Sequence, residues 1–141
     1  MPPSTDLHRF VEAQDSAGVY ALALAELRRG RKHGHWMWFV FPQIAGLGHS
    51  PTAQHYAIAD LDEARRYLAD PVLGPRLREC ARALAGLDTS DPVDVLGPVD
   101  ALKLHSSMTL FTLADPDEPA FRAVLDQYYG GALDDGTTSR V

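Results

Sequence analysis

Apolar residues recur at helical spacing along most of the chain, at every third or fourth position. One such run spans residues 7–14 and a second spans residues 20–27. Gly30 follows the second run and is a residue type that commonly ends helices. These patterns predict two consecutive helices, the first with a side-chain cap at Ser4 or Thr5.

Three further helix starts are predicted where a capping side chain immediately precedes a proline. These pairs are Ser50-Pro51, Asp70-Pro71 and Asp91-Pro92. Proline is favoured in the first helical turn because that position needs no backbone N–H donor. Helices are therefore expected to begin near residues 51, 71 and 92.

The spacing of apolar residues over 73–84 gives one of these helices an inward face, and the runs 99–111 and 121–128 predict two later helices. Strands do not alternate with helices, and no internal repeat is visible. The sequence thus predicts a compact all-α fold of about six to seven helices. It is expected to form a single domain over residues 1–141, with residues 132–141 as a loose tail.

The segment from Trp36 to Phe41 is the one place where the pattern leaves the type of element open. Its residues are all apolar, and they fit a buried strand or a short buried helix. Hydrophobic periodicity does not separate the two at this length. A helix is favoured because no partner strand is visible in the sequence.

Composition and charge narrow the class of protein. The 141 residues are 45% hydrophobic and 23% charged, which is ordinary for a soluble domain. The formal net charge of -6 argues against unspecific binding of nucleic acid, although residues 28–32 form a basic cluster. Residues 36–41 are the longest apolar run, and it is too short for a membrane span. We expect a cytoplasmic protein without a membrane partner, and the sequence does not indicate its oligomeric state.

The lone cysteine, Cys80, rules out an intrachain disulfide and lies in an apolar row, so we expect it in the core. Six histidines are many for this length, yet their spacing does not fit a metal site. We expect neither a metal nor a cofactor. His33 and His35 are interpreted as contacts to an anion or substrate, with a metal pair and a structural turn as the alternatives.

Candidate chemistry centres on residues 33–43, which hold both tryptophans between histidines and a glutamine, directly after the basic cluster. Planar rings beside cations suit a planar anionic ligand. We expect Trp36 or Trp38 to stack on a base, and Arg31, Lys32 or His35 to hold a phosphate. The candidate ligand-binding residues are Lys32, His35, Trp36, Trp38, Gln43 and, from a later helix, Ser107.

Charged residues elsewhere could supply catalysis. Asp100, Lys103 and Ser107 share one helical face, and the first two form either a surface ion pair or part of a site. Glu12, on the first predicted helix, is either solvated or a general acid or base in a glycosidic reaction opposite Asp100. The candidate catalytic residues are therefore Glu12, Asp100 and Lys103.

Two motifs give the chain a family resemblance: His35-Trp36-Met37-Trp38-Phe39-x-Phe41-Pro42-Gln43, and Asp100-x-x-Lys103-Leu104-x-Ser106-Ser107-Met108-Thr109-Leu110-Phe111. With further matches over nearly the whole chain, it resembles a bacterial family catalogued as a domain of unknown function. Members of that family are sometimes mislabelled calpastatin. The resemblance implies a mainly helical fold and no established activity.

The order of parts is also similar, more distantly, to the NADAR superfamily, small helical proteins tied to ADP-ribose and N-glycosidic chemistry. An early helix with Glu and Gln is followed by a Tyr-x-x-x-x-x-x-Glu-Ala helix and then by a segment with an aspartate. The Trp-Gly that follows this aspartate in that superfamily is missing here. The likeness implies roles for Glu12, Gln14, Trp36, Asp100 and Lys103.

The leading hypothesis is a protein that binds a small nucleotide-derived ligand or hydrolyses an N-glycosidic bond in it. It requires the convergence in one pocket of His35, Trp36, Gln43 and Lys103. The alternative is a non-enzymatic protein-interaction module, in which the aromatic stretch is core and the cations of residues 28–35 contact an acidic partner.

Overall fold

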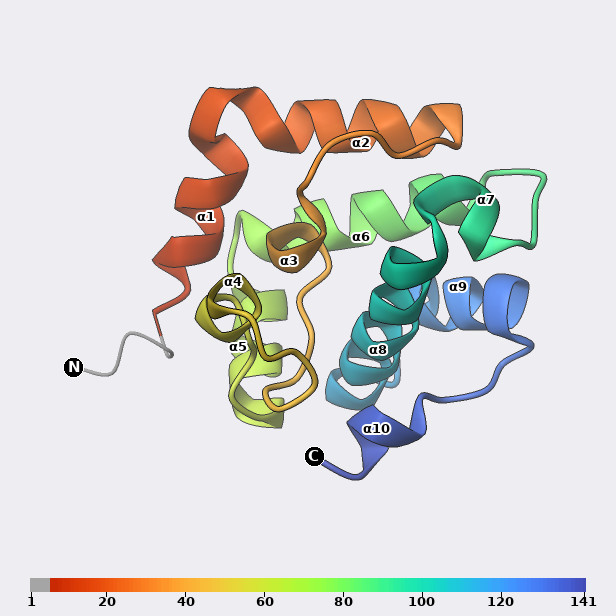
Figure 1. The fold of residues 1–141 in the computed structure, drawn as a ribbon. Helices are drawn as coiled ribbons and strands as arrows, with labels where there is room; N and C mark the ends of the chain where they lie inside the picture. Colours follow the sequence, from red (N-terminus) through yellow and green to blue (C-terminus); the bar gives the residue numbers. More distant parts are fainter. Residues whose placement is uncertain (1–5) are drawn as a thin grey trace.

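The computed structural model describes residues 6–141, and every regular element in this range is a helix (Figure 1). The longer helices are α1 (His8–Asp15), α2 (Val19–Arg29), α5 (Leu61–Ala69), α6 (Leu73–Ala85), α8 (Pro98–Ala114) and α9 (Pro119–Tyr129). The short ones are α3 (Met37–Val40), α4 (Pro51–His55), α7 (Pro92–Leu96) and α10 (Asp135–Thr138). The all-α prediction is confirmed. The described residues form more helices than the six to seven expected, and two of the expected ones, α4 and α7, are among the short helices of four or five residues.

Capping side chains begin helices close to the predicted positions. Ser50 caps α4 and Asp91 caps α7, each by accepting a backbone N–H from the first turn. Asp70 likewise accepts the backbone amides of residues 72 and 73, but α6 begins at Leu73, two residues after the proline. The helix starts therefore follow the local capping chemistry that the sequence displays.

The first two helices are separate, as predicted, because the chain turns sharply between them through the 3-10 turn η2 (Ser16–Gly18). Ala17 has a φ of 54° and Gly18 a φ of 67°, both in the left-handed region that interrupts a right-handed helix. Gly30 ends α2 in the same conformation, with a φ of 77°. The predicted cap at Ser4 or Thr5 lies outside the described residues.

The segment whose type the sequence left open is helical, since residues 37–40 form the single turn α3. After α3 the chain becomes extended, and Ile44 makes one isolated parallel bridge to Ile58. The Ile58 amide donates to the carbonyl oxygen of Gln43 at 2.8 Å. This bridge ties the segment after α3 to the segment between α4 and α5.

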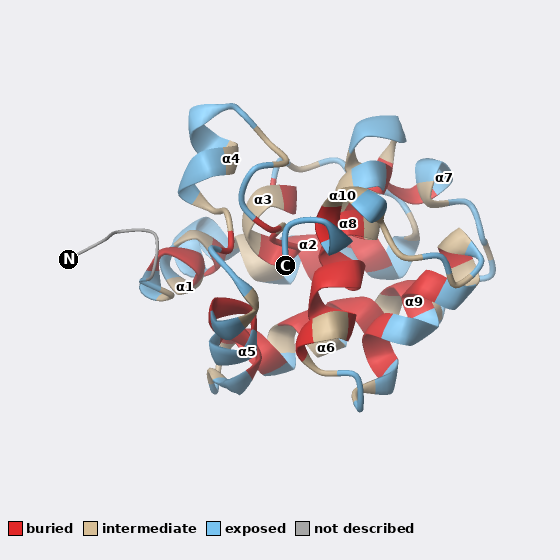
Figure 2. Ribbon diagram, turned by 90° about the horizontal axis from the view of Figure 1, so that it is seen from below, coloured by how far each residue is buried: buried red, intermediate tan, exposed pale blue. Residues whose placement is uncertain are grey.

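A row of aromatic rings in the core joins four of the helices. Phe10 of α1 meets Tyr67 of α5 edge-on at 5.1 Å between ring centroids, and Tyr67 lies 5.3 Å from Phe111 of α8. Phe111 in turn lies 5.9 Å from Phe121 of α9. All four rings are buried. Helix α6 packs against α2, α5 and α9, and Figure 2 shows the buried faces of α6, α8 and α9 turned toward one another.

Single residues of the core agree with the sequence pattern in most places but not throughout α8. Cys80 is fully buried, as expected, and burial raises the pKa of its thiol to about 12. Val99 and Leu102 belong to the apolar run that predicted α8, yet they are 64% and 70% exposed.

Within the described residues, no helix is both long and apolar enough to cross a lipid bilayer.

The prediction of a loose tail over residues 132–141 is wrong. Helix α10 packs on α8, and Thr137 is fully buried. The Asp134 carboxylate accepts hydrogen bonds from the Thr137 hydroxyl at 2.7 Å and from the Ser106 hydroxyl at 3.1 Å. The backbone amide of Asp134 donates to the Thr109 hydroxyl at 2.9 Å. Polar side chains anchor this segment, so an apolar pattern could not reveal it.

Replacing Asp134 by alanine should lower the free energy of unfolding by about 1–2 kcal/mol, because it removes the cap of α10 and the bond to Ser106. Chemical denaturation measures the loss. The neighbouring variant Asp135→Ala is the control, since Asp135 is exposed. Equal effects of the two substitutions would contradict the anchoring role of Asp134.

Candidate functional site

A buried carboxylate on α2 holds the loop that leads into the aromatic segment. Glu26 is 3% exposed, and its Oε1 atom accepts hydrogen bonds from the His33 amide at 2.8 Å and the Gly34 amide at 2.9 Å. The same oxygen accepts the Trp36 indole N–H at 2.9 Å. Burial alone raises the pKa of a carboxyl group, but these three donors outweigh it and hold the pKa of Glu26 below its ordinary value.

Trp36 is therefore a structural residue in this conformation. Its side chain is 1% exposed, and its indole nitrogen is already engaged by Glu26. It also packs against Phe41, with 6.3 Å between ring centroids. The expectation that Trp36 stacks on a ligand is corrected, because neither face of its ring is open to solvent.

Two lysines and one carboxylate connect the aromatic segment to α8. Lys32 lies 2.8 Å from Asp100, and Lys103 lies 3.6 Å from the other oxygen of the same carboxylate. The Lys32 ammonium lies 5.1 Å from the Trp36 ring centroid. The Lys103 ammonium lies 4.6 Å from the centroid of Trp38. Residues more than 60 positions apart in the sequence thus meet, and we call Lys32, Asp100 and Lys103 the lysine–aspartate cluster.

The side chains of this cluster are largely withdrawn from water. The exposed fractions are 9% for Lys32, 18% for Asp100 and 21% for Lys103. The Lys32 ammonium also donates to the carbonyl oxygen of Gly34. Lys32 is consequently not the free phosphate-binding cation that the sequence suggested, and Asp100 is held as an ion-paired carboxylate.

Beside this cluster lies a pocket of about 580 Å³ between α3 and α4. Its lining is mostly aromatic: His35, Trp38, Phe39, Pro51, Thr52, His55 and Tyr56. Phe39 and Tyr56 pack at 5.3 Å between ring centroids. Lys103 does not line this aromatic pocket, although it lies over the Trp38 ring. Trp38 therefore contacts both the lysine–aspartate cluster and the pocket.

Buried polar groups on α1 position the walls of the aromatic pocket. Arg9 is 8% exposed, and its guanidinium donates at 2.8 Å to the carbonyl oxygens of both His55 and Ala57, on either side of Tyr56. The Arg9 guanidinium also lies 3.4 Å from the buried carboxylate of Glu63. On the other wall, the Gln14 amide donates to the carbonyl oxygen of Phe39 at 2.7 Å.

Besides Trp36 and the lysine–aspartate cluster, three further predicted site residues lie outside the aromatic pocket. Glu12 is exposed, lies 3.6 Å from His8, and lines a neighbouring pocket of about 400 Å³. This N-terminal pocket shares His55 and Tyr56 with the aromatic pocket. Gln43 lies beyond α3 and does not line either pocket. Ser107 is fully buried, and its hydroxyl has no hydrogen-bond partner among the described residues.

The predicted convergence is therefore partial. Lys103 and the aromatic segment do meet, and His35 and Trp38 do share a pocket. Trp36 lies in the core instead, and Glu12 lines a pocket other than that of Trp38. No group of three or more potential metal ligands is found within residues 6–141.

Several residues that form the walls of the aromatic pocket were not predicted from the sequence. Pro51, Thr52 and His55 belong to α4, and Tyr56 is the residue that ends it, so these four positions are spaced at i, i+1, i+4 and i+5. That spacing could have indicated a shared face. Glu26 was also missed. It sits three residues after the buried Ala23, on a face that is otherwise apolar.

Comparisons with known proteins agree with the fold and supply no activity. Residues 4–141 match the family described as "protein of unknown function (DUF1810)". The crystal structure of the conserved hypothetical protein Rv1873 from Mycobacterium tuberculosis is similar, with a TM-score of 0.91 and 51% sequence identity. The match covers 95% of this chain and 94% of that one. Among curated proteins the chain has no significant match.

Replacing Glu26 by glutamine should lower the free energy of unfolding at neutral pH by about 1–3 kcal/mol, because hydrogen bonds to a charged acceptor become bonds to a neutral one. Denaturant titration of both proteins measures it. The exposed variant Glu12→Gln is the control and should change stability by less than about 0.5 kcal/mol.

The difference in stability between wild type and Glu26→Gln should depend on pH. Because folding lowers the pKa of Glu26, its stabilisation is present above the ordinary glutamate pKa and is lost as pH falls through the lower folded-state value. The stability difference between wild type and Glu26→Gln should therefore shrink below about pH 4. A difference that grows on acidification would contradict this assignment.

Proposed function

The chain belongs to the DUF1810 family, proteins of unknown function, and we propose that its aromatic pocket binds a small planar ligand of the nucleotide-derived class. One observation supports this most directly. Trp38 lines a pocket with Phe39, Tyr56 and two imidazoles while its ring also lies under the Lys103 ammonium. Binding, and not catalysis, is the function that the geometry favours.

The size and lining of the aromatic pocket support a small-molecule site. Its volume of about 580 Å³ falls within the range of roughly 300–1,000 Å³ that is common for such sites. Rings of Trp38, Phe39 and Tyr56 offer flat apolar surface, and such rings stack well on a nucleobase. The imidazoles of His35 and His55 add hydrogen-bonding groups that can select its polar edge.

Charge also points to a neutral or anionic ligand. The Lys103 ammonium is attracted to the electron-rich face of the Trp38 ring and polarises the electrons of the ring toward itself. The ring is consequently a poorer partner for a second cation and a better one for an electron-rich plane. No carboxylate is among the residues that line the aromatic pocket. A cationic aromatic ligand would find no counter-ion there.

N-glycosidic cleavage, the activity that a distant likeness to the NADAR superfamily implies, is a second candidate. It is favoured by the N-terminal pocket, where Glu12 lies beyond the wall formed by His55 and Tyr56. A ligand with a planar ring in one pocket and a sugar in the other would bring its glycosidic bond near this wall. Glu12 is the stronger candidate acid or base, because Asp100 is held by Lys32 and Lys103.

Replacing Trp38 by alanine should weaken binding of an adenine nucleotide or ADP-ribose by roughly 1–3 kcal/mol, because a stacking face is lost. A thermal-shift screen finds the ligand, since one present at 100 times its Kd adds about 2.7 kcal/mol of stability. Calorimetric titration then compares the variant with wild type. Leu22→Ala, which truncates a half-exposed apolar side chain of α2 outside the pocket, should leave affinity unchanged.

If neither a nucleotide, a nucleoside nor ADP-ribose raised the melting temperature of the wild-type protein, the binding proposal would be wrong. The protein-interaction module would then be preferred. In that case the buried Trp36 is a residue of the structural core. The exposed cations Arg29 and Arg31 are then available to contact an acidic partner.

Catalysis is tested separately with Glu12→Gln. If the protein cleaves an N-glycosidic bond with Glu12 as acid or base, this variant should keep the ligand affinity of wild type and lose turnover by a factor of about 100 or more. Product formation is followed by chromatography of the released base. Unchanged turnover in Glu12→Gln would exclude the role of this residue while leaving the binding proposal intact.

A further inference from the structure

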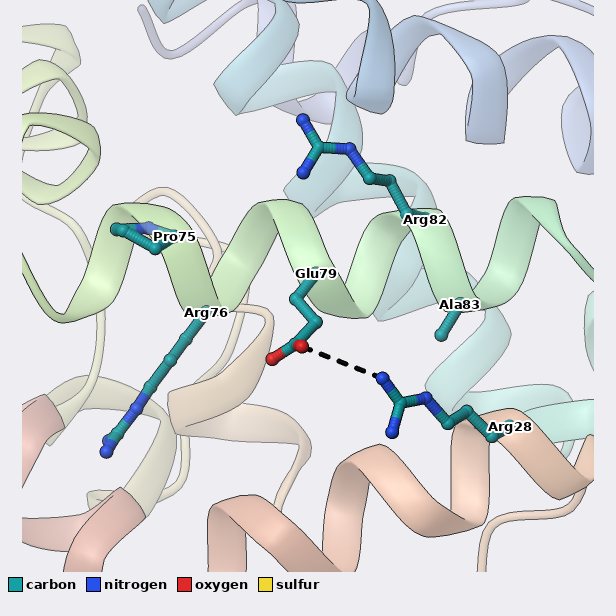
Figure 3. A pocket seen from close by; sticks show the side chains of 6 residues that line it. All are labelled: Arg28, Pro75, Arg76, Glu79, Arg82 and Ala83. Carbon is teal, nitrogen blue, oxygen red and sulfur yellow. Dashed lines mark ion pairs between the residues drawn. The ribbon is translucent and has the colours of Figure 1, made fainter.

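We propose a second ligand site, a phosphate-binding groove between α2 and α6 that is separate from the aromatic pocket (Figure 3). The groove has a volume of about 560 Å³. Its charged lining consists of three guanidinium groups, from Arg28, Arg76 and Arg82, and one carboxylate, from Glu79. The ligand would be a small molecule that bears a phosphate or diphosphate group.

Arg76 is fixed in place before any ligand arrives. Its guanidinium lies 2.9 Å from the Asp15 carboxylate and donates to the side-chain oxygen of Gln14 at 3.2 Å. It also stacks over the Tyr20 ring, 4.7 Å from the centroid. A guanidinium held from three sides loses little conformational freedom when it binds an anion. Arg76 therefore forms a preorganised end of the groove.

Glu79 lies between Arg28 and Arg76 in Figure 3. Its carboxylate accepts a hydrogen bond from the Tyr20 hydroxyl and lies 3.6 Å from Arg28. Arg28 is 63% exposed and Glu79 is 47% exposed, so this ion pair contributes little to stability. A phosphate can replace Glu79 as the partner of Arg28 at low cost.

Arg82 extends from the other side of α6 (Figure 3). It is exposed, and no carboxylate of the described residues lies within ion-pair distance of it. The groove therefore has one exposed guanidinium group beside Arg76, that of Arg28, which is available to an incoming anion, whereas Arg82 extends away from Arg28 on the opposite side of α6. Guanidinium groups bind phosphate through paired N–H donors, which a lysine ammonium does not offer.

The charge around the groove selects the size of the ligand. Three guanidinium groups stand against two carboxylates, Glu79 in the lining and Asp15 paired with Arg76, so the groove keeps a small positive charge, whereas the whole chain has a formal net charge of -6. A long polyanion such as nucleic acid would also meet the acidic surface, but a small phosphate compound would not. The aromatic pocket shares no lining residue with this groove.

The test is a calorimetric titration of the full-length protein with pyrophosphate at constant ionic strength. Wild type should bind it saturably, and Arg28→Ala should weaken the affinity by about tenfold, the usual size of one charge-assisted pair. Arg82→Ala should weaken the affinity less, because the Arg82 guanidinium lies on the opposite side of α6 from Arg28. Glu79→Gln should strengthen binding by several-fold, because the repelling carboxylate is gone.

Arg29→Ala is the matched control, because Arg29 is the next residue along α2, is exposed and does not line the groove. It removes the same charge and should change the affinity less than twofold. Equal effects of Arg28→Ala and Arg29→Ala would mean that pyrophosphate is attracted by the overall positive charge of this surface and is not bound in the groove. That result would overturn the proposal. The absence of saturable binding by wild type would overturn it as well.

Discussion

The candidate site depends on the hydrogen bonds that converge on one oxygen of Glu26. That oxygen receives two backbone amides and the Trp36 indole, so it fixes the path of the chain from His33 to the start of α3. A carboxylate is buried at a high cost unless several donors satisfy it. Here the loop itself supplies the donors, so the loop and the buried Glu26 carboxylate stabilise each other. With Trp36 held in the core, His35 and Trp38 on either side of it face the aromatic pocket.

The buried guanidinium of Arg9 fixes the opposite wall of the aromatic pocket, which contains Tyr56. Arg9 binds the carbonyl oxygens on both sides of Tyr56, and Glu63 compensates its charge. Because these groups are buried, each would leave unsatisfied partners if it were removed. The pocket is thus formed by short segments without extensive secondary structure of their own. Charged side chains of the long helices α1, α2 and α5 hold those segments in place.

Much of the fold could be predicted from the sequence because local chemistry determines it. Helical periodicity, proline after a capping residue, and glycine after an apolar run each act within a few positions, and they correctly indicated α2, α4 and α7. The anchored tail was missed because its contacts, from Asp134 and Thr137 to α8, are polar and distant in sequence. Periodicity contains no information on such partners.

The site was predicted less well for a related reason. Three residues of the stretch 33–43, His35, Trp38 and Phe39, do line the aromatic pocket, but the sequence does not distinguish the faces of a one-turn helix such as α3. Trp36 and Trp38 are two residues apart, and they differ because one indole reaches Glu26 while the other lies under Lys103. The meeting of Lys103 with the aromatic segment was required by the hypothesis of a shared site, and the structure does bring Lys103 over Trp38. The roles of Arg9 and Glu63 did not, since a buried ion pair has no local pattern.

The role of Trp38 in binding is tested by recording both indole N–H signals in ¹H–¹⁵N NMR spectra during titration with ADP-ribose. The chain has two tryptophans, and a Trp38→Phe variant assigns their signals. We expect the Trp38 signal to shift saturably, whereas the signal of the Trp36 indole N–H, which is bonded to Glu26, stays nearly unchanged. A shift of the Trp36 signal alone, or of neither signal, would contradict the assignment of Trp38 as the ligand-stacking residue.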